Sequence, residues 1–502
     1  MKHTNKKIAS VLLALLLALS QLTIPVLILP SSAEQALPEE ERGPVINMYM
    51  SPTSISIDRG QAFQLTALPQ VSGAVSWSTQ NSSIATVTQY GLVVGVSAGT
   101  TYITAMVDSL EPGINAAQCQ VTVSSNGIVA NGTYFIRSAQ NLSVDQYIDV
   151  EGPSSSNGAK MQLWELTGAA QRKWTMTLGT DGYYRVKSNY SSKYMRVTGS
   201  SPTAGATITQ NSSIVSGSKW ALMRTAAGNY AFVPASSASS LVVLNSPGAS
   251  NGYDLNTATY TANTNYKDEW IPIRMLPLSG SELNYSSSLT SWTRDEVELS
   301  CNCFAYAINN QIYPGGNSIW VKQQMGEYYS SSYSFSVNDE SAIYDGIAQD
   351  FAKRNYIFST NNLFGRINDK YDVCPSGTYK IALFATSPNS TYKDYHWYRQ
   401  DADGLWSHKR GLTEVTRLDN SQKQIIDPEL ADRNYGNYNY TEFLGYYYVT
   451  PWNGEYTTVT NPTYYYMGSY YNYHPFGLLL NSNGSLVKSN KLFNLNIFRS
   501  CR

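Results

Sequence analysis

The chain has 502 residues and a formal net charge of −1, with 14% charged and 42% hydrophobic residues. This length predicts about three domains, and a chain poor in charge but rich in Tyr, Ser, Asn, Thr and Gly is typical of β-rich extracellular modules. No basic stripe stands out in the sequence, which argues against a nucleic-acid partner.

The N-terminus has the three parts of an export signal. The basic start MKHTNKK precedes the apolar run IASVLLALLLALS, and PSSA offers a small-residue cleavage site near Ala33. We therefore predict a signal peptide over residues 1–33 and a linker over 34–45, for a secreted or cell-surface protein with export of Gram-positive type. The alternative is an uncleaved anchor, because TIPVLIL extends the apolar stretch. No later run reaches the ~18 apolar residues of a stable membrane span.

Short strands separated by Gly, Ser, Pro and Asn turns run through residues 46–125, which predicts a β-sandwich. The stretch VSWSTQNSSIATVTQYGLVVGVSAGTTYITA resembles the bacterial immunoglobulin-like domain of group 2. The residues that carry this resemblance are Trp77, Ile84, Val87, Gly91, Gly95, Gly99 and Ile103. The resemblance implies a surface spacer or adhesion module. Cys119 alternates with valines and is expected in the core of this domain.

The next segment contains three similar units. GTYFI, GYYRV and GNYAF each have the pattern Gly-x-Tyr-x-apolar, and each unit closes on a tryptophan, at Trp174, Trp220 and Trp270. One such unit cannot bury its apolar face alone, whereas three units closed around an axis can. Residues 129–275 thus resemble the β-trefoil of ricin-B-type lectins.

The first unit has the sugar-site pattern of that family, with Asp149, Gln162, Trp164 and Gln171. A carboxylate accepts from sugar hydroxyls, amides bridge others, and an aromatic ring stacks on the sugar. The resemblance implies a galactose-type or other cell-surface glycan as partner. The family usually has Asn where this chain has Ala170, so one hydrogen bond is missing.

The other two units depart from this pattern. Arg196 stands at the Asp place of the second unit and Val243 at that of the third, while Thr209 and Asn211 replace Gln162 and Trp164 in the second. Their pockets are expected to be inactive or altered. The alternative for the whole trefoil is a spacer without sugar binding.

Helical periodicity first appears after residue 276. NCFAYAINNQ places Phe304, Ala307 and Ile308 on one face, and Ser300 or Asn302 can cap the helix. Cys303 then lies in the first turn, where unpaired N–H groups and the helix dipole favour an anion such as a thiolate.

A cysteine nucleophile needs a base, and His396 and His408 lie on two strands predicted around DADG. This order resembles papain-like and NlpC-like cysteine hydrolases. The resemblance implies an α+β domain over 276–502 that acts as a peptidase or amidase on peptide or peptidoglycan substrates. Cys303 would attack, His396 would carry the proton, and His408 or Asp427 would orient the imidazole.

The length of the hairpin loop decides where His408 points. A three-residue loop from Ala402 to Gly404, with Gly404 left-handed, puts His408 on the face of His396. A loop of only Asp403 and Gly404 would put it on the other face. We favour the three-residue loop.

Other roles for the cysteines stay open. Cys301 or Cys303 could pair with Cys374 or Cys501 in a disulfide, or Cys303 could be a buried thiol without reactivity. The cysteine and histidine spacing is not that of a zinc site, so no metal or cofactor is expected. The sequence thus predicts a mainly β multi-domain protein, either a carbohydrate-binding hydrolase or a non-enzymatic adhesin.

Overall fold

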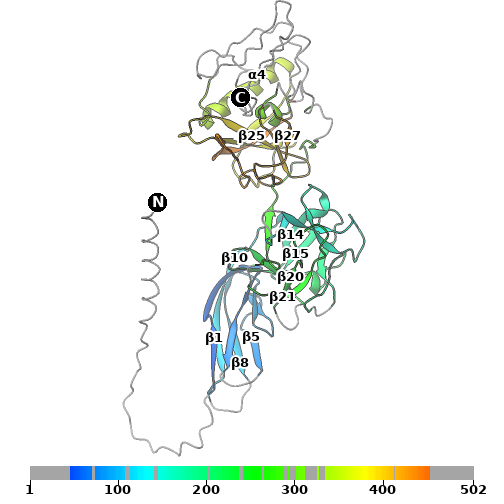
Figure 1. The fold of residues 1–502 in the computed structure, drawn as a ribbon. Helices are drawn as coiled ribbons and strands as arrows, with labels where there is room; N and C mark the ends of the chain where they lie inside the picture. The colour runs from blue at the N-terminus through cyan, green and yellow to red at the C-terminus, as the bar shows by residue number, and fades with distance from the viewer. Residues whose placement is uncertain are drawn as a thin grey trace, which may run out of the picture.

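The computed structural model describes residues 46–452 with gaps at 70–73, 108–112, 141–144, 200–202, 237–240, 263–264, 286–291, 293–300, 311–324, 327–333 and 412. The predicted signal peptide, the linker and Cys501 lie outside these described residues. Strands dominate three successive regions of the chain (Figure 1), which confirms a mainly β multi-domain fold. In the described part, no helix has the length and apolar character needed to cross a membrane.

The first region is a β-sandwich whose strands alternate inward and outward residues. In β8, Ile103 and Ala105 are buried while Tyr102 and Met106 are exposed, as expected for a half-buried strand. Cys119 is buried in the same core, as predicted. The strands are β1 Ile46–Ser51, β2 Ser54–Arg59, β3 Gln61–Gln64, β4 Thr66–Pro69, β5 Val75–Thr79, β6 Ala85–Val87, β7 Leu92–Gly95, β8 Gly99–Val107, β9 Gly113–Ile114 and β10 Ala116–Gly127.

The second region is built around three buried tryptophans in equivalent positions. Trp174, Trp220 and Trp270 donate their indole N–H to the backbone oxygens of Ile148, Met195 and Leu244, at 2.9, 3.1 and 3.0 Å. The strands are β11 Gly132–Ser138, β12 Gln146–Val150, β13 Met161–Glu165, β14 Trp174–Leu178, β15 Tyr184–Ser188, β16 Tyr194–Val197, β17 Ile208–Asn211, β18 Trp220–Arg224, β19 Tyr230–Pro234, β20 Val242–Asn245, β21 Asn256–Thr259 and β22 Trp270–Arg274, with short 3-10 turns η2 Ala170–Arg172 and η3 Ser216–Ser218.

The sandwich and the second region share hydrogen bonds and apolar core. Strand β3 pairs in parallel with β18, Leu222 lying opposite Gln61. Ala62 of β3 and Val94 of β7 are buried against Ala221 and Met223 of β18. The two regions are therefore joined by a continuous sheet as well as by the chain.

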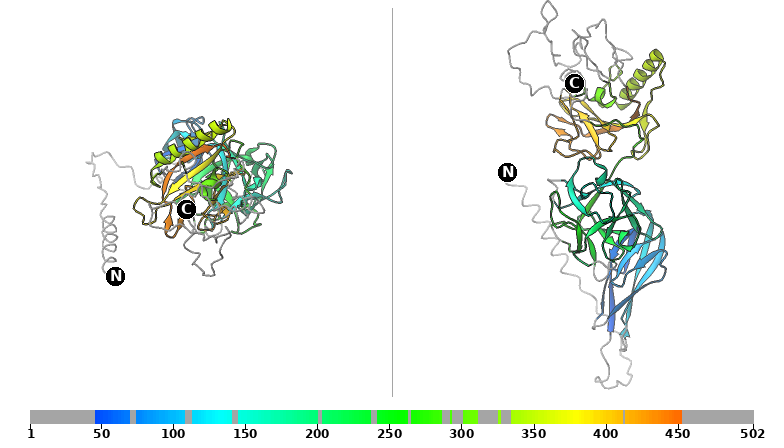
Figure 2. Two further views of the ribbon diagram at one scale, coloured as in Figure 1. Left: turned by 90° about the horizontal axis from the view of Figure 1, so that it is seen from above. Right: turned by 90° about the vertical axis from the view of Figure 1, so that its right-hand side faces the viewer.

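The third region is a six-stranded sheet with two helices. The strand order is β23-β30-β24-β25-β26-β27, and helices α3 and α4 pack against one face of it, as Figure 2 shows for α4. The elements are α3 Cys303–Ala307, α4 Glu340–Phe358, β23 Phe364–Ile367, β24 Tyr379–Ala385, β25 Tyr395–Gln400, β26 Trp406–Lys409, β27 Val415–Thr416, β28 Asn434–Tyr435, β29 Tyr438–Asn439 and β30 Glu442–Val449.

Helix α3 forms where the sequence predicts it. Asn302 is its N-cap, and its side chain accepts a hydrogen bond from the N–H of Ala305 at 2.9 Å. Phe304, Ala307 and Ile308 are all buried in the core beneath the helices. The helix is short because Ile308 has left the helical conformation and Asn309 has a positive φ of 57°.

The hairpin between β25 and β26 has the three-residue loop that was favoured. Gln400 pairs with Trp406, and the N–H of Asp401 donates to the oxygen of Leu405 at 2.9 Å. Gly404 adopts a φ of +84° in this loop. The loop faces the trefoil, because a Cβ added at Gly404 would lie 2.1 Å from the sulfur of Met275.

The third region contacts the trefoil around this loop. Phe135, Tyr147 and Leu166 of the trefoil pack with Leu405 and Ile426 of the third region. At the rim of this contact, the Nζ of Lys423 lies 3.3 Å from Asp145, and the guanidinium of Arg274 lies 3.9 Å from the ring centre of Tyr371.

We expect Gly404→Ala to destabilise the protein more than Gly436→Ala. Gly436 also has a positive φ, of +79°, but an added Cβ there meets nothing within 4 Å. The control should cost ~1–2 kcal/mol for the left-handed alanine, and Gly404→Ala should add ~1–3 kcal/mol for overpacking against Met275. Urea unfolding measures both variants, and equal losses would contradict the contact.

Candidate functional site

The predicted sugar-site carboxylate lies on β12, directly opposite Gln162 of β13. The Nε2 of Gln162 donates to Asp149 Oδ2 at 2.9 Å. The Nε of Arg172, from η2, lies 3.5 Å from Asp149 Oδ1. The structure therefore brings Asp149 and Gln162 together as predicted and adds Arg172, which sequence analysis missed although it directly follows Gln171.

Opposing effects act on the pKa values of Asp149 and Arg172. Burial raises the pKa of Asp149, while the hydrogen bond from Gln162 and the charge of Arg172 act in the opposite direction. Burial likewise lowers the pKa of Arg172, and Asp149 opposes that shift. Each charge thus lowers the cost of burying the other.

Two atoms of this group have unused hydrogen-bonding capacity. Asp149 Oδ1 and Arg172 Nε are both buried and both lack a hydrogen-bond partner among the described residues. Buried polar atoms of proteins are nearly always hydrogen-bonded, so such a pair requires an explanation. A single hydroxyl can fill both, because it can donate to the carboxylate and accept from the guanidinium.

The two remaining predicted sugar-site residues lie beside this pair. Trp164 is half-buried on β13 opposite Tyr147. Gln171 is half-buried in η2, a turn that packs against β12. No hydrogen bond joins either side chain to Asp149 within the described residues.

The equivalence of the three tryptophans defines the matching positions of the repeats. In each repeat, the indole N–H binds a backbone oxygen, and the residue directly after that oxygen's residue is the equivalent of Asp149. This residue is Arg196 in the second repeat and Asn245 in the third. The assignment of Val243 to that position is therefore wrong by two residues. The third repeat has a polar pair of its own, in which Asn245 Nδ2 donates to Asn256 Oδ1 at 2.7 Å.

Cys303 lies on the helical side of the six-stranded sheet. The thiol is fully buried with Phe304, Tyr395 and Trp397, and its sulfur lies 3.9 Å from the backbone oxygen of Tyr395. Cys119 and Cys374 are free thiols as well. Because Cys374 is free, neither Cys301 nor Cys303 pairs with it, and the alternative of a disulfide with Cys501 involves a residue outside the described part of the chain.

His396 and His408 meet on the opposite side of the sheet. His396 Nε2 lies 2.7 Å from His408 Nδ1, and His408 Nε2 lies 3.0 Å from the oxygen of Leu418. Because a carbonyl only accepts, His408 carries its proton on Nε2, and His396 Nε2–H donates to His408 Nδ1. The ring of His396 stacks on Tyr440, with centroids 5.1 Å apart.

The strand alternation separates the predicted nucleophile from the predicted base. Tyr395 and Trp397 face α3, so His396 between them faces away. No hydrogen bond joins the Cys303 sulfur to either imidazole, all three residues being described. Of the two predicted orienting residues, His408 contacts His396. Asp427 instead accepts from Lys370 Nζ at 2.9 Å and Tyr446 at 3.2 Å.

A buried charged network between α3 and the trefoil also escaped the sequence analysis. Asp401 accepts from Arg399, Arg417 and Ser407, the last at 2.9 Å. Tyr306 of α3 joins it through Ser407, with 2.7 Å between the hydroxyls. No cluster of metal-binding side chains occurs in the part of the chain that is described.

We expect the histidine pair to make the fold sensitive to acid. Burial lowers the pKa of His396 well below its usual value and that of His408 to about 4. The unfolded chain, with histidine pKa near ~6.5, binds more protons below that pH, so stability falls between pH ~6.5 and ~4, by about 3 kcal/mol for His408 alone.

Urea unfolding at pH 7 and pH 4.5 measures this effect. The matched variant replaces both His396 and His408 with Gln, which cannot titrate. Its stability should decline less with acid than that of the parent chain. Parallel declines would show that the pair is not held neutral by burial.

Family models match the first two regions of the chain. The bacterial Ig-like domain (group 2) matches residues 44–130, and the ricin-type beta-trefoil lectin domain-like model matches residues 115–211 and 170–261. Both resemblances predicted from sequence motifs are thereby confirmed.

Individual proteins resemble the chain over about a third of its length. The designed threefold symmetric protein ThreeFoil is 26% identical, over 29% of this chain and 100% of that one, with a TM-score of 0.25. The Rhizoctonia solani agglutinin is 16% identical, over 30% and 99%, with a TM-score of 0.26. The earthworm R-type lectin C-half, solved in complex with GalNAc, is 14% identical, over 28% and 98%, with a TM-score of 0.21.

One curated relative is closer in sequence. Insoluble matrix shell protein 1 of Ruditapes philippinarum is 32% identical over 162 residues, which are 32% of this chain and 87% of that protein. The chain therefore belongs to the family of insoluble matrix shell protein 1, and it carries a bacterial Ig-like (group 2) domain and a ricin-type β-trefoil lectin-like domain.

Proposed function

We propose that this protein binds glycans through the first repeat of its trefoil. The observation that carries the proposal is the buried pair Asp149 and Arg172, whose facing atoms lie 3.5 Å apart and lack hydrogen-bond partners among the described residues. The match to a lectin-type family model supports the same site.

The chemistry of the site suits a sugar hydroxyl. Gln162 holds one carboxylate oxygen of Asp149 at 2.9 Å, so the carboxylate is oriented before a ligand arrives. A small shift of the Arg172 guanidinium admits a hydroxyl that donates to Oδ1 and accepts from Nε. Charge-assisted hydrogen bonds of this type are the stronger ones in proteins.

Trp164 and Gln171 supply the other interactions of the proposed site. The half-buried indole of Trp164 offers a face on which the C–H side of a pyranose can stack. The amide of Gln171 can bridge a second hydroxyl. A galactose-type sugar is the first ligand to test, because the resemblance to ricin-B-type lectins implies that class.

Two substitutions in the first repeat should weaken sugar binding. Asp149→Asn keeps the shape but removes the charge, and Trp164→Ala removes the stacking face. Loss of a charged hydrogen bond of ~1.5–3 kcal/mol weakens affinity by about tenfold or more. Titration calorimetry of the full chain with N-acetylgalactosamine and lactose measures the dissociation constants.

Asn211→Ala is the matched control, because Asn211 occupies the Trp164 position of the second repeat. It should bind like the parent chain. Thermal unfolding shows whether each variant keeps its fold. Parent-like affinity of folded Asp149→Asn and Trp164→Ala would remove the site assignment.

Cysteine hydrolase activity in the third region stays a prediction. In its favour, Cys303 begins a capped helix and His408 orients His396. Against it, the His396 ring lies on the side of the sheet away from α3. The ring would have to move to the other side of the sheet before it could accept a proton from the Cys303 thiol. A peptidase or amidase acting on peptides or peptidoglycan therefore ranks behind glycan binding.

Iodoacetamide labelling at neutral pH distinguishes the two possibilities. A hydrolase requires fast modification of Cys303 that slows in His396→Ala. Cys374 is the internal reference, because burial raises the pKa of its thiol to about 11 and makes it slow. Equally slow labelling of Cys303 and Cys374 would leave a non-enzymatic glycan-binding protein.

We also propose that the protein works outside the cell or on its surface. The support is the signal-peptide pattern of residues 1–33 and the occurrence of glycan ligands at cell surfaces. Mass spectrometry of protein recovered from the culture medium tests it by locating the mature N-terminus.

A further inference from the structure

One outer face of the Ig-like sandwich has an unusual composition. The sheet β2-β10-β8-β5 turns one side to the core, and the outward residues of its strands are Ser, Thr, Gln, Tyr and Met. The nearest carboxylate, Asp58 at the end of β2, is half-buried and accepts from Ser124. Apart from Asp58 at its edge, the described part of this face is neutral and rich in hydrogen-bonding groups.

The side chains of this face are ordered by bonds across the strands. Three alternate, outward-facing residues of β10 lie directly opposite three of β8, and each opposed pair is hydrogen-bonded. The pairs are Gln118 to Thr104 at 3.1 Å, Gln120 to the Tyr102 hydroxyl at 3.1 Å, and Thr122 with Thr100 at 3.3 Å.

This ordering leaves regular binding groups directed at solvent. Each glutamine uses one amide N–H in its cross-strand bond, which leaves a second N–H and the carbonyl oxygen. Because the side chains are already held by their neighbours, a ligand has less rotamer freedom to remove on binding. The face thus offers a preorganised row of neutral donors and acceptors.

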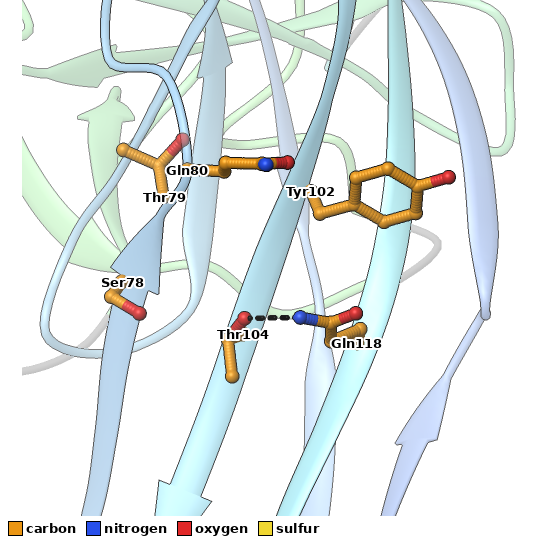
Figure 3. Close-up of a pocket in the computed structure, with 6 residues that line it drawn as sticks. All are labelled: Ser78, Thr79, Gln80, Tyr102, Thr104 and Gln118. Carbon is orange, nitrogen blue, oxygen red and sulfur yellow. Dashed lines mark hydrogen bonds between the residues drawn. The ribbon is translucent and has the colours of Figure 1, made fainter.

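A hollow of about 420 Å³ lies beside this row (Figure 3). Its walls are Ser78, Thr79 and Gln80 on one side and Tyr102, Thr104 and Gln118 on the other. The ring of Tyr102 is 38% exposed, and the bond from Gln120 to its hydroxyl fixes its position. An aromatic ring beside amides and hydroxyls is the combination that binds sugars.

We propose that this face, centred on Tyr102 and Gln118, is a second carbohydrate-binding surface that takes a neutral polysaccharide chain. Among its described residues, the face has no cation for an anionic ligand and no broad apolar patch for a protein. Hydroxyls of a neutral glycan match its amides and hydroxyls, and Tyr102 supplies the stacking ring. The trefoil leaves this face open, because it contacts the sandwich through β3 and β7.

The surface goes beyond the trefoil site because it uses different residues and a different fold. The pairing of β3 with β18 connects the two domains that carry these sites. A polysaccharide that reaches both would be held by two weak contacts at once, which raises the overall affinity well above that of either site.

Affinity electrophoresis of the full chain tests the surface. The background variant is Trp164→Ala, which silences the trefoil site. The gels contain hydroxyethylcellulose, glycol chitin, galactan or polygalacturonate. We expect at least one of the three neutral polymers to retard the background variant, and polygalacturonate not to do so.

Added substitutions locate the binding. Tyr102→Ala and Gln118→Ala should each weaken retardation about tenfold, while Tyr102→Phe, which keeps the ring, should lose less. Tyr49→Ala is the control and should behave like the background, because Tyr49 is an exposed tyrosine on β1, in the other sheet of the sandwich. The proposal is overturned if no neutral polymer retards the background variant, if polygalacturonate retards it equally, or if Tyr102→Ala has no effect.

Discussion

The hydrogen bond from a buried indole to a backbone oxygen, repeated three times, is the constraint on which the trefoil and its proposed glycan site depend. Trp174, Trp220 and Trp270 each hold a strand of their own repeat at about the same distance. A buried indole N–H must be paired, so each tryptophan fixes the register of the strand that it contacts. The residue after each acceptor then occupies an equivalent position in its repeat.

That constraint explains how the three repeats can share a fold while carrying different chemistry at equivalent positions. In the first repeat the equivalent place is Asp149, paired with Gln162 and faced by Arg172. In the second it is Arg196, which cannot accept from sugar hydroxyls. In the third it is Asn245, satisfied by Asn256. The buried core residues maintain the fold in all three repeats. The residue that follows each backbone acceptor differs in charge and hydrogen bonding from one repeat to the next.

Sequence patterns predicted those parts of the structure that depend on local periodicity. The spacing of the Gly-x-Tyr motifs and the tryptophans predicted the trefoil, and strand alternation predicted the sandwich core around Cys119. The DADG motif, with its left-handed glycine, predicted the hairpin that joins the strands of His396 and His408.

The errors arose where long-range packing decides the position of a residue. Val243 was misplaced because the position equivalent to Asp149 in β20 is identified by the long-range hydrogen bond from Trp270, which the sequence does not show. Arg172 was missed because an arginine after Gln171 is uninformative until η2 folds against β12. The side of the sheet on which His396 lies depends on how α3 docks.

The parallel pairing of β3 with β18 has a mechanical consequence. If the trefoil is held while the N-terminal end is pulled, the load is shared between the connecting chain and that short ladder, where Leu222 lies opposite Gln61. Pulling along paired strands strains their hydrogen bonds together, whereas pulling across them breaks one bond after another. The direction of the pulling force, more than its size, would thus decide whether the β3–β18 pairing stays intact or separates.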